Sequence, residues 1–165
     1  MLSPSLPDDA RLWIFTADRT LTAEDQAQLL DDLNRFVAQW ASHGRPVPGD
    51  VAIHEDRFVL VGGHLEGGVS GCGIDSLTHA VEEAGTERGI RWVDGLSIVF
   101  RDSEGTIHVL PRPAFRQLVR DGAVTGATLV FDTTVQTVGD LREHGLERPA
   151  RLTWHGRVFR LMEPA

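Results

Sequence analysis

The sequence predicts an α+β fold: a single twisted, mainly antiparallel sheet with helices on one face. Short runs rich in β-branched and aromatic residues recur along the chain, and the segments between them carry apolar residues at helical spacing. The first elements follow the order strand, helix, two strands, helix, strand. That order is the ferredoxin-like pattern, so we expect such a core followed by a C-terminal α/β extension. Another α+β sandwich with the same order of elements is the alternative.

The N-terminal half supplies the clearest elements. Arg11–Thr16 is expected to form the first strand. Thr22 then begins a helix with Asp25 as its capping-box partner, and His43-Gly44 ends that helix. A hairpin and a second helix follow. The hairpin strands are expected at Val51–His54 and Arg57–Val61, and the second helix carries the apolar stripe Ile74, Leu77, Val81 and Ala84.

The C-terminal half contains shorter elements, and the last of them is ambiguous. Arg151–Leu161 is expected to be a strand or a tight hairpin turning at His155-Gly156. No linker or repeat interrupts the chain, so residues 1–165 are expected to form a single domain. The other expected elements are strands at Leu96–Arg101, Thr106–Leu110 and Thr128–Asp132, a helix from Pro113 to Arg120, and a helix capped by Thr137 and Asp140 and ended by Gly145.

The charged residues exclude several classes of function. All 16 basic residues other than histidine are arginines, and the net charge is −8. Without lysine there is no P-loop ATPase chemistry and no lysine Schiff base. Without tyrosine there is no tyrosine acid or base. The acidic balance also disfavours nucleic acid and anionic membrane as partners, because both are bound through basic surface.

The single cysteine, Cys72, cannot form an internal disulfide, so a cytoplasmic location is expected. The first residues lack the basic start and apolar run of a signal peptide. No apolar stretch approaches the length of a membrane span.

The glycine-rich loop at residues 62–76 is the most informative segment of the chain. Glycine lets the backbone bend sharply and approach a ligand closely, and the helix that follows directs unpaired N–H groups into the loop. The spacing matches no known phosphate-loop fingerprint. We therefore predict a generic site for a small molecule or anion, with a plain surface connection as the alternative. The candidate ligand-binding residues are Ser70, Gly71, Gly73, Ser76 and, after the first strand, Arg19.

Cys72 is the candidate nucleophile, because a thiol at a helix N-terminus is favoured as the thiolate. Asp75 and His79 would share its helix face at i+3 and i+7. In a thiol-dependent mechanism, Asp75 would orient His79 and His79 would accept the thiol proton. The spacing permits this mechanism without requiring it, because i to i+7 spans about 10 Å along a helix.

We expect no metal and no cofactor, since the chain has no CxxC, HxH or HExxH motif. The alternative to ligand binding by Arg19 is a surface ion pair with Asp18 or Glu24. The expected partner is an unknown small molecule or protein. The competing hypothesis is a non-catalytic interaction module that uses a sheet edge or the arginine and aromatic tail at residues 148–160.

Ser70-Gly71-Cys72-Gly73-Ile74-Asp75-Ser76 resembles the S-G-C-S-I-D hallmark of a family of small bacterial proteins, many of which carry the label "ABC transporter ATPase". Further similar motifs lie at Leu6–Ile14, Phe36–Gly44 and Val130–Thr137, and Gly73 and Gly95 depart from the pattern where the family has serine and arginine. The resemblance implies family membership and a cytoplasmic setting. It implies no mechanism, and the missing lysine contradicts the ATPase label.

Overall fold

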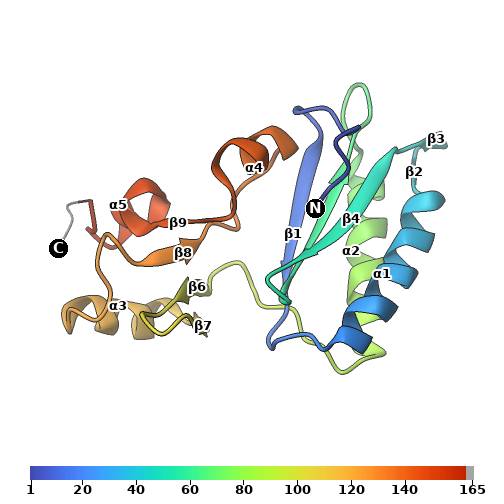
Figure 1. Ribbon diagram of the computed structural model, residues 1–165. Helices are drawn as coiled ribbons and strands as arrows, with labels where there is room; N and C mark the ends of the chain where they lie inside the picture. Colours follow the sequence, from blue (N-terminus) through green and yellow to red (C-terminus); the bar gives the residue numbers. More distant parts are fainter. Residues whose placement is uncertain (163–165) are drawn as a thin grey trace. The chain divides into compact units, whose positions relative to one another are not determined.

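A computed structural model describes residues 1–162 and confirms the α+β class (Figure 1). The chain forms two compact units. Unit 1 comprises Met1–Val93 and Gln136–Arg142, and unit 2 comprises Asp94–Val135 and the chain from Glu143 onward. That these units behave as the single expected domain stays a prediction.

The sheet of unit 1 has three antiparallel strands in the order β1-β5-β4. They are β1 (Arg11–Thr16), β5 (Phe58–Gly63) and β4 (Gly49–His54). The central strand β5 is buried along its whole length, which explains its uninterrupted apolar sequence. The predicted hairpin between β4 and β5 is confirmed, and Glu55 and Asp56 adopt positive φ angles of 53° and 52° at its turn.

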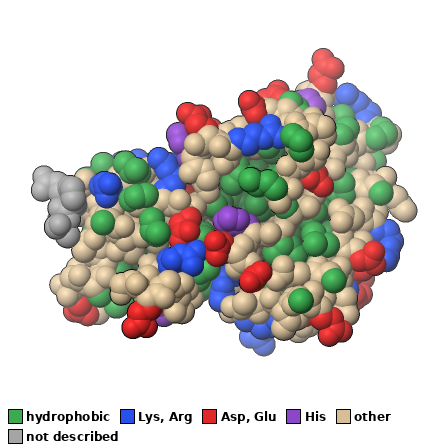
Figure 2. Space-filling model, in the orientation of Figure 1, with side chains coloured by type: hydrophobic (Ala, Val, Ile, Leu, Met, Phe, Trp, Pro, Cys, Tyr) green, Lys and Arg blue, Asp and Glu red, His purple; other side chains and the backbone are tan. Residues whose placement is uncertain are grey.

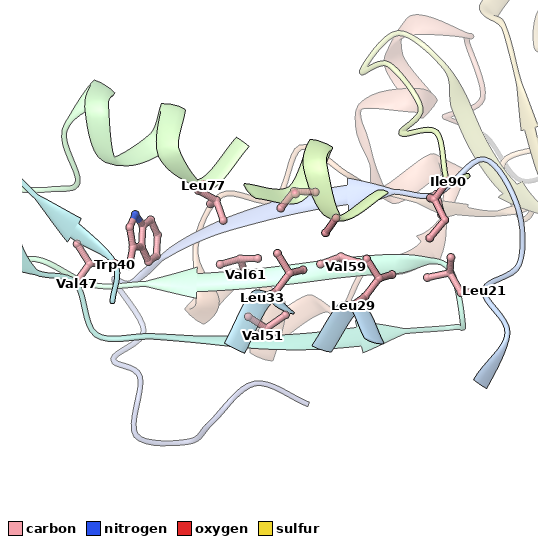
Figure 3. Packing of buried hydrophobic residues seen from close by; sticks show 13 residues of the cluster. Leu21, Leu29, Leu33, Trp40, Val47, Val51, Val59, Val61, Leu77 and Ile90 are labelled. Atoms are coloured by element: carbon pink, nitrogen blue, oxygen red, sulfur yellow. The ribbon is translucent and has the colours of Figure 1, made fainter. Parts of the chain in front are cut away.

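Two helices cover one face of this sheet and lie beside each other (Figure 1). They are α1 (Ala23–Ala38) and α2 (Gly71–Thr86). Thr22 and Asp25 form the predicted capping box at the start of α1. Leu29 and Leu33 of α1 face the sheet valines, and Leu77 reaches the same core from α2 (Figure 3). Burial of these apolar side chains between helices and sheet is the main source of stability for unit 1.

The predicted end of α1 at His43-Gly44 is wrong, because α1 stops at Ala38. His43 and Gly44 instead form the turn of a two-residue hairpin, β2 (Ala41–Ser42) and β3 (Arg45–Pro46). Both turn residues have positive φ, 51° and 76°. The left-handed backbone region that ends many helices is also the region that tight hairpin turns require, so the same residue pair suits either role.

The prediction of one continuous sheet is wrong. Beyond β1, where the ferredoxin-like pattern would place a fourth strand, the outer edge of β1 is met by two short segments. Trp92 forms a single antiparallel bridge with Ala17 near one end. Near the other end the amide of Leu12 donates to the carbonyl of Gln136 at 2.9 Å. After Val93 the carboxylate of Asp94 accepts two nearby backbone N–H groups, so the chain turns instead of continuing along β1.

The remaining strands form a separate four-stranded antiparallel sheet in unit 2, ordered β7-β6-β8-β9. Its core centres on Phe100, Phe115, Val130 and Phe159. The strands are β6 (Ile98–Arg101), β7 (Ile107–Leu110), β8 (Leu129–Phe131) and β9 (Glu147–Pro149). The helices are α3 (Arg112–Arg120) and α5 (Trp154–Val158), and α4 (Val138–His144) begins in unit 1.

The predicted strand or hairpin at Arg151–Leu161 is also wrong. That segment forms the end of a 3₁₀ turn at Ala150–Leu152 and then α5. The hydroxyl of Thr153 caps α5 by accepting the amide of His155 at 3.3 Å. The cap fixes a helix in a segment for which the sequence predicts a strand or a hairpin. Within residues 1–162, no helix combines the length and apolar character needed to cross a membrane.

Candidate functional site

The glycine-rich loop leaves the end of β5 and enters α2. Gly63, the last residue of β5, is needed for packing: a Cβ there would lie 2.5 Å from Cζ3 of Trp40. Gly67 and Gly68 follow with φ angles of 84° and 89°, in the left-handed region that favours glycine. The loop sequence thus serves two needs, close approach of an indole and a tight reversal of the backbone.

Trp40 links the beginning and the end of the loop. Its indole is buried, packs under Gly63, and donates from Nε1 to the carbonyl of Gly73 at 2.9 Å. Trp13 meets the same indole edge to face, with ring centroids 5.5 Å apart. A buried indole N–H needs a partner, and here the partner is the first turn of α2. Trp40 therefore holds the loop and the helix N-terminus in one arrangement.

The short β2–β3 hairpin braces the end of the loop. The buried Ser42 hydroxyl is 2.6 Å from Oγ of Ser70 and accepts the Ser70 amide at 2.9 Å. Ser70 Oγ in turn accepts the amide of Gly73, as an N-cap does. Ser70 is thus engaged in holding α2. Sequence reasoning missed Ser42 because it is 28 residues away from its partner.

A hollow of about 410 Å³ lies over the first half of the loop, and we call it the loop hollow. Its walls come from residues 63–69, together with Arg11, the first residue of β1, and Asp9 two positions before it. Arg11 and Gly63 are directly paired across the β1–β5 ladder, so the sheet register places the arginine beside the loop. The predicted loop therefore does form part of a concave site.

The charged groups of the loop hollow have both signs. The Arg11 guanidinium lies over the ring of Trp13, 5.4 Å from its centroid, and no carboxylate of residues 1–162 forms an ion pair with it. Nδ1 of His64 lies 3.8 Å from a carboxylate oxygen of Asp9, and Glu66 completes the charged lining. A ligand with an anionic group and a hydrogen-bond donor would match this set.

His64 also lines a neighbouring hollow of about 470 Å³, formed by the N-terminal segment and the start of β4. In that hollow the amide of Ser3 donates to the carboxylate of Asp50. The imidazole is thus shared by two adjacent hollows of unit 1.

The structure does not bring the predicted thiol residues into one site. Cys72 lies exposed in the first turn of α2 and is absent from the lining of the loop hollow. Asp75 is also exposed, and the His79 imidazole is 80% exposed and lies 3.7 Å from the carboxylate of Glu83. Helix geometry keeps His79 two turns, about 10 Å, from Cys72. The three residues share the exposed face of α2 but make no contact with one another.

Of the predicted ligand-binding residues at the start of α2, most have a role within the helix. Gly73 is buried against Val69 and Ser42, and the Ser76 hydroxyl donates to the carbonyl of Cys72 at 2.9 Å. Gly71 is exposed, with open space around it. Among these predicted ligand-binding residues, Gly71 therefore offers only its backbone to a ligand.

Arg19 lies away from the glycine-rich loop, at the opposite end of α2. One of its nitrogens donates to Asp25 at 2.5 Å and another to the carbonyl of Arg88, just beyond the end of α2. Helix α2 has 16 residues, so its two ends are about 24 Å apart. The hydrogen bond to Asp25 raises the pKa of Arg19, and the same bond, with the Thr22 amide, lowers the pKa of Asp25 to about 2.

The tail at residues 148–160 uses its aromatic residues for packing. Phe159 is buried against Phe115, with ring centroids 4.8 Å apart, and Trp154 stacks on His155. The Arg112 guanidinium covers the Trp154 ring at 5.1 Å. On the face shown in Figure 2, acidic and basic side chains are interspersed. The tail therefore presents arginines to solvent without an aromatic platform beside them.

No known family model, curated protein or solved structure matches the chain. Among residues 1–162, no group of three His, Cys, Asp or Glu side chains is arranged to hold a metal ion. The functional conclusion therefore rests on the geometry of the loop hollow. Its charged residues Asp9 and Arg11 were not singled out from the sequence, and the only signal was their position at the entry to the first strand.

Proposed function

We propose that the protein binds a small polar molecule in the loop hollow, and that this molecule carries a carboxylate or phosphate group. The supporting observation is a concave site of about 410 Å³ lined by Arg11, which forms no ion pair with any carboxylate of residues 1–162. Arginine is suited to such groups because its planar fork of N–H donors matches two oxygens at once.

Each part of the hollow has a role in this proposal. Arg11 holds the anionic group, while stacking on Trp13 limits the motion of the guanidinium. Asp9 and Glu66 accept hydrogen bonds from a hydroxyl or amino group of the ligand. The braces from Trp40 and Ser42 fix the loop before the ligand arrives, which reduces the entropy lost on binding. We place this function in the cytoplasm, in line with the single cysteine.

The proposal is tested with glycerol 3-phosphate, inorganic phosphate and glycerol as probes, followed by amide NMR shifts of the full chain. We expect glycerol 3-phosphate to move the signals of Gly67 and Gly68 saturably, phosphate to do so more weakly, and glycerol to have no effect. Arg11→Gln should abolish the response. Arg35→Gln removes the same charge from the exposed face of α1 and should leave the response unchanged.

An equal response in Arg11→Gln and in the unaltered protein would contradict the proposal. So would shifts that map away from residues 63–69. Loss of binding in both variants would show general charge attraction in place of a site, because Arg35 lies outside the hollow lining.

A thiol-dependent reaction at Cys72 is the second candidate, favoured by the exposure of the sulfur. The predicted base is not in place, since His79 lies two helical turns from the thiol and 3.7 Å from the carboxylate of Glu83. If Cys72 is the functional residue, Cys72→Ser will abolish the cellular function while Arg11→Gln leaves it intact. The opposite pattern supports the loop hollow.

A further inference from the structure

Unit 2 contains a larger pocket that is separate from the loop hollow. It has a volume of about 700 Å³ and lies between the β6–β7 turn, the end of α3 and the segment leading into β8. We call it the β6–β7 pocket. This volume is within the range of sites that hold small organic molecules, roughly 300–1,000 Å³.

One side of the β6–β7 pocket is apolar. Leu118 and Val124 contribute to its wall, and Ala123, Ala127 and Leu129 line it while remaining exposed to solvent. Leu129 is 37% exposed, although it belongs to a strand of the sheet. Apolar side chains that line a hollow and face water release that water when an apolar molecule takes its place.

The lining of the pocket also includes a histidine and an aspartate in direct contact. Nε2 of His108 lies 2.6 Å from Oδ2 of Asp102. The other carboxylate oxygen of Asp102 accepts the amides of Glu104 and Thr106, each at 2.9 Å. The hydrogen bond from His108, together with these amides, lowers the pKa of Asp102, so the carboxylate is ionised and acts as the acceptor.

This contact determines the hydrogen-bonding character of His108. An ionised carboxylate holds the proton on Nε2, so in the neutral imidazole the lone pair is on Nδ1. Nδ1 of His108 has no hydrogen-bond partner within residues 1–162. In its neutral form His108 therefore brings one unused acceptor to a pocket that also has apolar residues in its lining.

The imidazole is also fixed in orientation. His108 lies opposite Phe100 in the β6–β7 ladder, and the two rings stack with centroids 5.2 Å apart and planes 24° apart. Phe100 is itself buried and packs edge to face on Phe115. The stacking on Phe100 and the hydrogen bond from Nε2 to Asp102 hold the His108 ring in one orientation before any ligand binds. This orientation favours a directed hydrogen bond to the ligand.

The β6–β7 turn does not need His108 to close. The amide of Asp102 donates to the carbonyl of Thr106 at 2.9 Å, and Gly105 donates back to Asp102 at 3.1 Å. The guanidinium of Arg101 bonds the carbonyl of Gly105 at 3.0 Å. These bonds close the turn without the imidazole, so His108 is available for another role.

We infer that the β6–β7 pocket binds a small aromatic molecule bearing one hydroxyl group, with the ring against the apolar wall and the hydroxyl donating to Nδ1 of His108. Thr125 and Thr128 lie in the same lining, and their hydroxyls favour a ligand that carries a polar group. Both already accept backbone amides, at 3.2 Å and 2.9 Å, so they retain their own O–H donors for the ligand oxygen.

Phenol and anisole are the probes, because they differ in the hydroxyl proton and have the same ring. Binding is measured on the full chain by amide NMR shifts of residues 123–129 at millimolar probe concentration. We expect phenol to bind roughly tenfold more tightly than anisole, the ratio that one net hydrogen bond provides. Ala127→Leu should weaken both probes, since it fills the apolar side.

His108→Phe is the matched variant, because it keeps the stacked ring and removes the acceptor. It should bind anisole as before and lose the preference for phenol. Asp102→Asn is a second variant: its amide donates to Nε2, which moves the imidazole proton to Nδ1 and removes the acceptor there while His108 stays in place. It should also lose the preference for phenol.

Equal affinities for phenol and anisole in the unaltered protein would overturn the inference. So would a preference for phenol that survives in both His108→Phe and Asp102→Asn, or the absence of any shift in residues 123–129 with either probe. These outcomes are independent of the loop hollow, which lies in the other unit and is tested with other probes.

Discussion

Acid should destabilise the protein through one buried histidine. His155 is 1% exposed, its Nδ1 lies 2.8 Å from the Thr153 hydroxyl, and its ring stacks on Trp154 at 3.9 Å. Burial lowers the pKa of His155 to about 4 from the ordinary 6.5, with a further lowering by Arg112 and an opposing effect of Asp132. The folded protein therefore keeps this imidazole neutral at pH values where an unfolded chain protonates it.

The sign and size follow from proton binding. Between about pH 6.5 and about pH 4 the unfolded chain binds more protons than the folded protein, so the free energy of unfolding falls as pH falls through that window. Above it, the contribution of His155 is constant. The expected loss is about 2 kcal/mol between pH 7 and pH 5, and about 3 kcal/mol when the whole window is crossed.

The assay is urea unfolding at pH 7 and pH 5, compared between the unaltered protein and His155→Gln. Glutamine does not titrate, so the variant should lose about 2 kcal/mol less stability on acidification. His79→Gln removes an 80% exposed imidazole and is the matched control, with an unchanged pH dependence expected. If His155→Gln folds poorly, NMR titration of the His155 ring in the unaltered protein gives the same information. A measured pKa near 6.5, or equal pH dependence in all three proteins, would refute the reasoning.

Three further predictions concern unit 1. Gly63→Ala should lower the free energy of unfolding by about 1–3 kcal/mol, because its Cβ would lie 2.5 Å from the Trp40 ring, and indole fluorescence in urea measures this cost. Cys72 should be alkylated fully by iodoacetamide in the native protein, and Cys72→Ser should change stability by less than about 0.5 kcal/mol; slow labelling would show a covered thiol. Asp25, whose pKa is lowered to about 2 chiefly by Arg19, contributes stability that is present above its ordinary pKa of 3.8 and lost as pH falls toward 2. Asp25→Asn should therefore show a weaker acid dependence in the same unfolding assay between pH 5 and pH 3.

The elements that could be predicted from sequence are those set by neighbouring residues. The side chains of Thr22 and Asp25 each accept the backbone amide of the other residue, three positions away. The capping box could therefore be predicted directly from the sequence. The turn at Glu55-Asp56 lies between two apolar runs and defines its own hairpin. In both cases all the interacting groups lie within a few residues, which a local pattern records.

The pairing of strands could not be predicted, because the competing partners are distant in the chain. The segments that pair with the outer edge of β1 contain Trp92 and Gln136. Neither segment has a sequence pattern that indicates its pairing partner. The same applies to the site. Arg11 reaches the loop through its ladder partner Gly63, and this pairing depends on the register of β1 against β5. The loop could be located from its glycines, whereas its charged lining required the sheet.

Gly73 shows how packing can require glycine in the first turn of a helix. A Cβ at this position would lie 2.8 Å from Cγ1 of Val69 and 3.3 Å from Cβ of Ser42. The carbonyl of Gly73 also accepts the Trp40 indole, so the backbone cannot move away without losing a buried hydrogen bond. Val69 and Ser42 both belong to the bracing of the loop. Gly73 therefore allows the end of the loop to pack tightly against Val69 and Ser42. Because Val69 also lines the loop hollow, this packing helps to fix the shape of the hollow.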